Sequence, residues 1–378
     1  MRPYIFSVKI YGVIVRAEPS WLFLVLLVAW SLAVGFFPEA EAGLSTETYV
    51  AMAVLAVIGL TVSIVAHELS HTFVGRAFGL PINHVTLFLF GGAAELEEEP
   101  DRPLVELVMA LAGPLMSLFL SAVFFLASDL PGLQSSWLPL ALVLGYLGLI
   151  NLILALFNMV PAFPLDGGRV LRAILWMFGT SQRQATRIAS IAGEAFAVFL
   201  IVNGVLVLLL AGTAAGLWWV LIGFFLRSAA RSARLQHETR LALRDQRVSD
   251  LIQPGLETAD ARSSVETFIR EKLVLHHRDW CPVVDGTHLV GGAGVREAEA
   301  VARDERADKR VGEIAVKPEA GQVIDAHTGA DTALRRIQHH HLDRLYVVDS
   351  DKLVGVLMAA DLIAYARMKH RFEDAGLR

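Results

Sequence analysis

Long apolar runs alternate with short polar connections over the first 226 residues of the chain. An apolar helix of about 20 residues crosses a hydrocarbon core about 30 Å thick. We therefore predict six membrane spans, at residues 21–37, 49–78, 103–127, 137–159, 188–211 and 215–226. Two other stretches read as strands. Residues 1–19 are expected to form an edge strand at the membrane surface, and residues 84–97 a hairpin.

The hairpin is predicted from the run HVTLFLF, a turn at Gly91-Gly92 and a returning strand AELEEE. Strand backbone is tolerated at membrane depth only where it is buried in protein or lines a wet cavity. One interpretation is therefore a hairpin partly within the membrane, with an open edge that binds an extended peptide. The alternative is a plain surface hairpin.

The pattern changes after residue 227, where charged residues and histidines replace the apolar runs. We expect a polytopic α-helical membrane domain at residues 1–230, a basic linker at 231–246 and a soluble α/β domain at 247–378. The composition, 54% hydrophobic and 19% charged with a mean hydropathy of +0.52, excludes an ordinary soluble protein. No basic field suggests nucleic acid as a partner. The lone Cys281 excludes an intrachain disulfide and is typical of a reducing compartment.

The orientation in the membrane is predicted from lysine and arginine, which are retained on the cytoplasmic side. The connections at 38–48, 128–136 and 212–214 contain neither residue. The N-terminal segment, the connections at 79–103 and 160–187, and the segment after residue 227 all contain arginine. We therefore expect a multi-pass protein of the cell membrane with both termini and the soluble domain in the cytoplasm.

The second apolar run contains three ionisable residues, His67, Glu68 and His71, in the pattern HExxH. In a helix the two histidines lie one turn apart and can direct their imidazoles toward one point. Catalytic zinc sites usually have three protein ligands and a water molecule, and a glutamate beside them can serve as the base. The pattern also occurs by chance, but ionisable groups inside a membrane helix are costly and usually functional. We therefore predict a zinc site.

Helix-breaking residues follow the fourth apolar run, in the segment NMVPAFPLDGGRV that starts at Asn158. Asp166 in this segment is the natural third zinc ligand, and Asn158 could donate its amide to a substrate carbonyl or a developing oxyanion. The alternative is a capped loop in which Asp166 begins the next helix. The pairing with the histidines favours the ligand, because two histidines alone leave the site one ligand short.

Four motifs give the first 230 residues a resemblance to the site-2 protease family of intramembrane zinc metalloproteases. They are AHELSH, FGGA, AGPLMS at residues 112–117, and NMVPAFPLDGGR, in the family's order and spacing. The resemblance implies one zinc ion per chain with His67, His71 and Asp166 as ligands and Glu68 as catalytic base. Asn158 matches a substrate-contacting asparagine of the family.

An internal repeat fills the soluble domain. VSDLIQP recurs as VGEIAVKP, and CPVVDGTHLVG recurs as LYVVDSDKLVG, with a period of roughly 64 residues. The domain is similar to a tandem pair of CBS domains, which implies a homodimer and an adenine nucleotide (ATP, ADP or AMP) between the repeats. Asp361 matches the acid that holds the ribose. Met358 departs from the family's serine or threonine, which weakens the nucleotide prediction.

These observations predict a zinc endopeptidase that cleaves transmembrane or membrane-proximal segments of single-span membrane proteins, with the CBS pair as a nucleotide-dependent gate. One alternative is a CBS-regulated transporter, since ionisable residues inside a helix bundle also mark ion paths. It predicts repeats among the spans, and residues 1–230 contain none that we recognise. The second alternative is a catalytically silent regulator with a structural zinc ion, which would have no need of Glu68.

Overall fold

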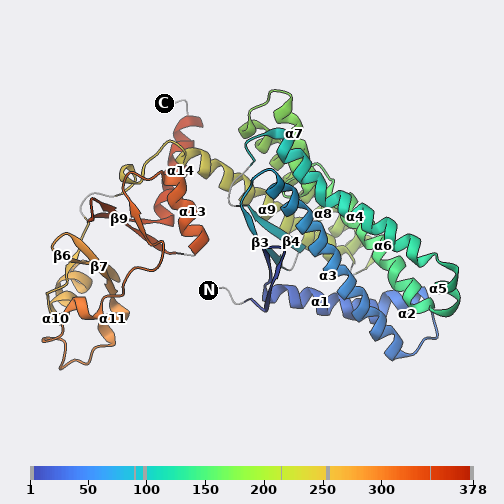
Figure 1. Ribbon diagram of the computed structural model, residues 1–378, viewed down its shortest axis with the longest axis horizontal. Helices are drawn as coiled ribbons and strands as arrows, with labels where there is room; N and C mark the ends of the chain where they lie inside the picture. Colours follow the sequence, from blue (N-terminus) through green and yellow to red (C-terminus); the bar gives the residue numbers. More distant parts are fainter. Residues whose placement is uncertain are drawn as a thin grey trace. The chain divides into compact units, whose positions relative to one another are not determined.

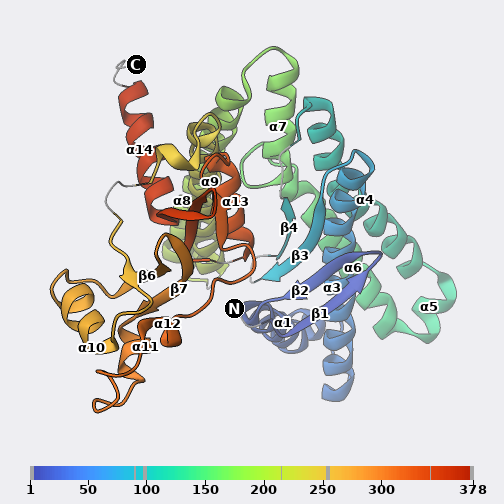
Figure 2. The ribbon, with the colours of Figure 1, turned by 60° about the vertical axis from the view of Figure 1, so that its left-hand side comes forward.

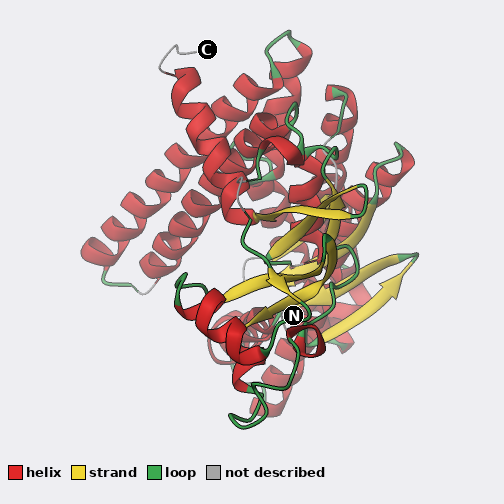
Figure 3. Ribbon diagram, turned by 90° about the vertical axis from the view of Figure 1, so that its left-hand side faces the viewer, coloured by secondary structure: helices red, strands yellow, loops and turns green. Residues whose placement is uncertain are grey.

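The computed structural model describes residues 4–88, 91–96, 100–213, 215–252, 256–340 and 342–374 (Figure 1). The chain divides into two compact units, Met1–Leu235 and Gln236–Arg378. The boundary falls within the predicted linker at 231–246, inside a helix, α9 (Ala215–Leu243), that belongs to both units. Helices make up most of the N-terminal unit, whereas the C-terminal unit is built on a sheet. Figure 3 colours the helices of the chain red and its strands yellow.

The helices of the N-terminal unit begin where the sequence supplies a cap or a proline. The Ser45 hydroxyl accepts a hydrogen bond from Thr48 N, the Ser181 hydroxyl accepts one from Gln184 N, and α1 and α4 each begin with proline. The helices before α9 are α1 (Pro19–Ser31), the π-helical η1 (Leu32–Phe36), α2 (Phe37–Ala40), α3 (Thr46–Ala77), α4 (Pro103–Ser128), α5 (Pro131–Ser136), α6 (Leu138–Asn158), α7 (Asp166–Met177) and α8 (Gln182–Ala211).

Among the described residues, five helices are long and apolar enough to cross a membrane, rather than the six that the sequence predicted. They are Pro19–Ala40, Thr46–Ala77, Pro103–Ser128, Leu138–Asn158 and Gln182–Ala211. The sixth predicted span, residues 215–226, is not among these candidates because its apolar run is short, and it stays a prediction. A run of this length reaches only about 18 Å as a helix, against a core of about 30 Å.

The helix that contains this short run nevertheless packs along a membrane span. Gly216 of α9 lies against Gly204 of α8, and Gly223 lies against Ile201. Further along, the Arg231 side chain of α9 forms an ion pair of 3.5 Å with Glu194 of α8. In these contacts, later residues of α9 meet earlier residues of α8, so the two helices are antiparallel. They remain in contact for about four turns.

A small sheet lies beside α3 in the N-terminal unit (Figure 2). Its strands are β1 (Phe6–Ile10), β2 (Val13–Ala17), β3 (Ile82–Phe88) and β4 (Gly91–Leu96), in that order. β2 and β3 are parallel, and the other pairs are antiparallel. Alternating residues of β2 and β3, from Val13 to Leu87, pack against Trp21, Ile64 and Leu69.

The predicted hairpin is therefore confirmed as β3 and β4, and the predicted strand in residues 1–19 is a strand pair. The predicted turn at Gly91-Gly92 is wrong, because both glycines belong to β4. The connection falls at residues 89 and 90, which lie outside the described part of the chain, as does residue 97 at the predicted end of the hairpin. β4 pairs only with β3 among the described strands, so it forms one edge of the sheet.

The C-terminal unit shows the predicted repeat as a six-stranded sheet in the order β5-β6-β7-β10-β9-β8. Each repeat supplies three adjacent strands, and the antiparallel pair of β7 and β10 joins the repeats at the centre. The strands are β5 (Ala259–Asp260), β6 (Trp280–Asp285), β7 (His288–Gly294), β8 (Val323–Asp325), β9 (Arg344–Asp349) and β10 (Lys352–Met358). The helices are η2 (Val248–Asp250), α10 (Val265–Phe268), η3 (Ile269–Val274), α11 (Val295–Glu299), α12 (Val311–Ile314), α13 (Ala330–His340) and α14 (Ala359–Asp374).

The segments that open the two repeats are exchanged between their hydrophobic cores. Val248 packs with the residues of the second repeat, and Val248 N donates a hydrogen bond of 2.9 Å to Thr328 O. Val311 packs with the residues of the first repeat, and Val311 N donates one of 2.9 Å to Ser263 O. Because each opening segment completes the other repeat's core, neither repeat encloses a complete core alone.

Candidate active site

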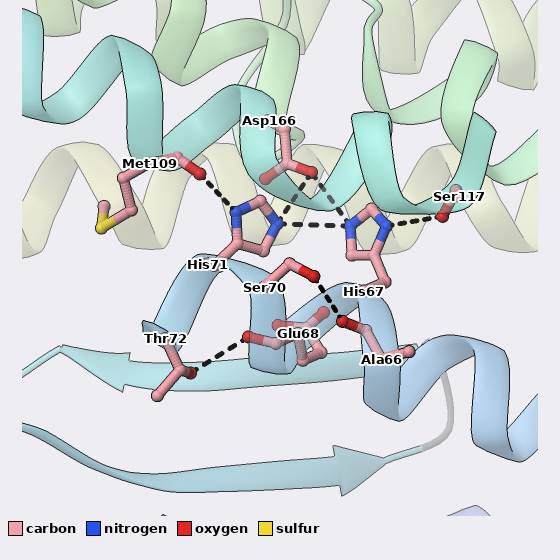
Figure 4. Close-up of polar contacts among 9 residues, drawn as sticks. All are labelled: Ala66, His67, Glu68, Ser70, His71, Thr72, Met109, Ser117 and Asp166. Atoms are coloured by element: carbon pink, nitrogen blue, oxygen red, sulfur yellow. Dashed lines mark hydrogen bonds and ion pairs between the residues drawn. The ribbon is translucent and has the colours of Figure 1, made fainter. Parts of the chain in front are cut away.

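Helix α3 directs His67 and His71 toward Asp166, the first residue of α7 (Figure 4). Asp166 Oδ2 lies 3.2 Å from His67 Nε2 and 3.3 Å from His71 Nε2, and the two Nε2 atoms are 3.3 Å apart. Both histidines are buried, at 3% and 8% of their full exposure. The structure thus brings together the three predicted metal ligands from segments 95 or more residues apart.

The spacing of these three atoms fits a zinc ion. A tetrahedral zinc site with ligand distances of about 2.0–2.1 Å separates its ligand atoms by about 3.3 Å, which matches all three observed distances. Burial opposes ionisation of the Asp166 carboxyl, but its contacts with His71 and His67 outweigh burial and hold its pKa below the usual range. The carboxylate is therefore ionised, as a metal ligand must be.

Helix α4 fixes the orientation of both imidazoles. His71 Nδ1 donates a hydrogen bond of 2.7 Å to the carbonyl oxygen of Met109, and His67 Nδ1 lies 2.8 Å from Ser117 Oγ. A neutral imidazole that donates through Nδ1 leaves the Nε2 lone pair free for a metal. The Met109 carbonyl can only accept, so it assigns the tautomer of His71 directly.

Glycines allow the surrounding backbone to approach the ligands. A Cβ atom on Gly113 of α4 would lie 2.6 Å from His67 Nε2 and would also collide with the His71 imidazole. A Cβ atom on Gly167 or Gly168 would collide with the backbone of the loop that precedes Asp166. The motifs AGPLMS and LDGG therefore contain glycine because the loop, α4 and the imidazoles leave no space for a side chain.

Glu68 belongs to the same helical turn but is not one of the clustered ligands. Its side chain is half-buried and lies against β4, where a Cβ atom on Gly92 would come within 2.5 Å of Glu68 Cγ. A glutamate beside the metal ligands, rather than among them, fits the role of a base. The contact also places the edge strand of the small sheet next to this carboxylate.

The two remaining predicted site residues have less specific surroundings. Asn158 is the half-buried last residue of α6, at the start of the loop that leads to Asp166, and its contact with substrate stays a prediction. Asp361 lies at the start of α14, where its Oδ2 accepts a hydrogen bond of 3.1 Å from Met358 N. This contact is typical of a helix cap, and nucleotide binding by Asp361 also stays a prediction.

Sequence reasoning missed the residues that support the ligands. It noted the AGPLMS motif but gave Ser117 no role, and it could not identify a backbone carbonyl such as that of Met109. It also missed the buried ion pair between Glu106 of α4 and Arg172 of α7. The sequence signals this pair by an acidic residue early in the third apolar run, but it does not identify the partner of that residue.

Comparisons with known proteins identify the family of the chain. Residues 55–135 and 134–203 match the sequence profile of Peptidase family M50, and residues 311–367 match that of the CBS domain. The chain is 32% identical over 357 residues to the zinc metalloprotease Rip3 of Mycobacterium tuberculosis, which covers 94% of this chain and 90% of that protein. It is 29% identical over 361 residues to the zinc metalloprotease sll0528 of Synechocystis sp., covering 94% and 93%.

One solved structure is also similar to part of this chain. The site-2 protease from Methanocaldococcus jannaschii is 26% identical, with 61% of this chain and 95% of that chain covered and a TM-score of 0.42. The profile matches and the two relatives that extend over nearly the whole chain establish the family. This chain is a membrane-embedded zinc metalloprotease with a CBS domain, and it belongs to peptidase family M50, the site-2 protease family.

Proposed function

We propose that the protein cleaves transmembrane or membrane-proximal segments of single-span membrane proteins. The observation that carries this proposal is the position of the ligand cluster: His67 and His71 belong to a membrane-span candidate, and β4 lies beside Glu68. Hydrolysis consumes water, so a hydrolytic site inside a membrane helix bundle is expected to act on a substrate that also lies in the membrane.

The residues of the site divide the chemistry among them. A zinc ion held by His67, His71 and Asp166 would polarise the scissile carbonyl and lower the pKa of water from about 15.7 to about 7. Glu68 takes the proton from the attacking water and passes it to the leaving amine. Asn158 donates its amide to the substrate carbonyl or to the developing oxyanion.

The open edge of β4 supports an extended substrate. A transmembrane helix satisfies its own amides, so it must unwind before a protease can reach the scissile bond. An unwound segment could add to the free edge of β4 by main-chain hydrogen bonds, as peptides do in β-augmentation. Gly92 would then place that segment close to Glu68.

The test is cleavage in liposomes that contain the purified full chain and a panel of single-span membrane proteins with a fluorescent tag at each end. We expect the wild type to separate the tags of at least one panel member, and Glu68→Gln to lose this activity while it retains its metal. Glu47→Gln is the matched control, because Glu47 is an exposed glutamate in the first turn of the same helix. Full activity of Glu68→Gln would refute the assignment of the base.

We also propose that both termini and the C-terminal unit are cytoplasmic, in the cell membrane. The arginine-free connections support this orientation, and so does the antiparallel packing of α9 along α8, which returns the chain to the side on which α8 begins. A C-terminal green fluorescent protein fusion should then fluoresce, and a C-terminal alkaline phosphatase fusion should be inactive. The opposite pattern would contradict the orientation.

The C-terminal unit is proposed to regulate cleavage through an adenine nucleotide and to form a homodimer. Continuity of α9 supports coupling, because the helix ends at Leu243, which is buried in the core of the second repeat. Calorimetric titration with ATP, ADP and AMP tests binding, and Asp361→Ala should weaken it. No heat with any of the three nucleotides would refute this part. Light scattering of the purified protein gives the oligomeric state.

A further inference from the structure

A buried ion pair connects two helices that contribute to the metal site. Glu106 of α4 is fully buried, Arg172 of α7 is 6% exposed, and the Arg172 Nε and Nη2 atoms both contact Glu106 Oε1. Neither residue is a metal ligand, and the proposed reaction does not use either one. A charged pair buried in a helix bundle is expensive to form and contributes little net stability, so its presence calls for another explanation.

The position of each partner relative to the ligands suggests that explanation. Glu106 lies one helical turn before Met109, whose carbonyl accepts the hydrogen bond from His71. Arg172 lies fewer than two turns after Asp166 on α7, a helix of only 12 residues. The pair therefore links the helix that orients His71 to the helix that carries Asp166.

Arg172 also holds the loop that leads to Asp166. Its guanidinium group lies 5.3 Å from the centre of the Phe163 ring, and its Nη1 atom lies 3.5 Å from Thr186 Oγ1 on α8. Phe163 N in turn donates a hydrogen bond of 3.1 Å to the α8 carbonyl of Ala189. One side chain thus joins α4, α8 and the loop immediately before the third ligand.

We infer that Glu106 and Arg172 form a positioning pair that sets the place of Asp166 relative to His67 and His71, and thereby the strength of metal binding. The inference rests on the proposed zinc site. A planar guanidinium group with several fixed contacts restrains direction as well as distance. Metal sites respond strongly to the groups that orient their ligands, with losses of about 10–100-fold in affinity when such a group is removed.

The experiment measures zinc affinity by competition with a chelator, on the detergent-purified full chain. The variants are Glu106→Gln, Arg172→Met and the double variant, with Asp166→Asn as the ligand variant. Ser121→Ala is the packing control, because Ser121 is a buried residue of α4 whose hydroxyl donates a hydrogen bond to Gly148 O and contacts no ligand. Each single variant should raise the zinc dissociation constant about 10–100-fold, and the double variant should raise it no further than either single variant.

A second readout separates positioning from folding. The visible spectrum of bound Co²⁺ reports the geometry of the ligands, and it should change in both single variants but remain unchanged in Ser121→Ala. If the single variants do not fold, Glu106→Leu with Arg172→Leu replaces the pair by apolar side chains, a change that buried ion pairs often tolerate. A folded double leucine variant should still bind zinc at least about tenfold more weakly than the wild type.

The outcomes distinguish the inference from the function on which it rests. Wild-type zinc affinity and an unchanged cobalt spectrum in the folded pair variants would overturn the positioning role, even though the wild type binds zinc. Failure of the wild type to bind zinc, or zinc binding that survives Asp166→Asn undiminished, would instead overturn the proposed metal site itself.

Discussion

Replacement of Ser117 by alanine tests whether α4 prepares the metal ligands. Ser117 is fully buried, and its hydroxyl lies 2.8 Å from Nδ1 of His67, which is itself only 3% exposed. The variant leaves that buried ring nitrogen without its hydroxyl partner, at a cost of about 1–3 kcal/mol. The imidazole can relieve this cost when no metal holds it, so most of the cost falls on the metal-bound state. Since 1.4 kcal/mol is a factor of ten, we expect zinc affinity to fall about 5–100-fold.

The assay is zinc competition with a chelator at fixed pH, with Ser121→Ala as control. Ser121 lies one helical turn after Ser117, is 4% exposed, and also donates a hydrogen bond of 2.8 Å, in its case to Gly148 O. Each variant removes one buried hydroxyl group from α4, but only the hydroxyl of Ser117 contacts a predicted metal ligand. Equal zinc affinities in the two variants would refute the reasoning, because the effect would then be one of packing alone.

Two further predictions concern space and burial. Gly113→Ala should abolish zinc binding while the chain remains folded by circular dichroism, because the added Cβ atom would collide with both imidazoles; retained zinc would contradict the close approach of α4. Burial raises the pKa of the Cys281 thiol, so iodoacetamide should modify it slowly in the native protein and rapidly in urea. Because the unfolded thiol ionises at lower pH than the folded one, stability of the C-terminal unit should fall as pH rises above about 8.5. Rapid native modification would show that β6 is accessible.

The site was predictable from the sequence to the extent that it depends on spacing along one helix. His67, Glu68 and His71 have a spacing that places them on neighbouring positions of one helix. Asp166 supplies the third ligand, which two histidines alone would leave missing. Long apolar runs predicted the spans for a similar reason, since length and hydropathy decide whether a helix can cross a membrane.

Features that depend on contacts between distant segments were not predictable. Nothing in a single sequence pairs Ser117 with His67, or Glu106 with Arg172, because a polar residue in an apolar run indicates that a partner exists without identifying it. Residues 215–226 are not among the candidate spans because their apolar run is short, although the 29-residue helix α9 that contains them packs along α8.

Local signals were also misleading where tertiary structure overrides them. Gly91 and Gly92 indicate a turn by composition, but both belong to β4, and position 92 is glycine because a side chain there would collide with Glu68. The repeat was visible in the sequence, whereas the exchange of Val248 and Val311 between the two cores was not, because a repeat pattern does not say which copy a segment packs against.

The most direct test of the account is the metal content of the detergent-purified protein, measured by elemental mass spectrometry for the wild type, His67→Ala and Asp166→Ala. The account predicts about one zinc ion per wild-type chain and a loss of zinc in both variants, since the two residues come from different helices and would hold the same ion. Zinc that persists in Asp166→Ala, or a wild type that contains no metal, would contradict it.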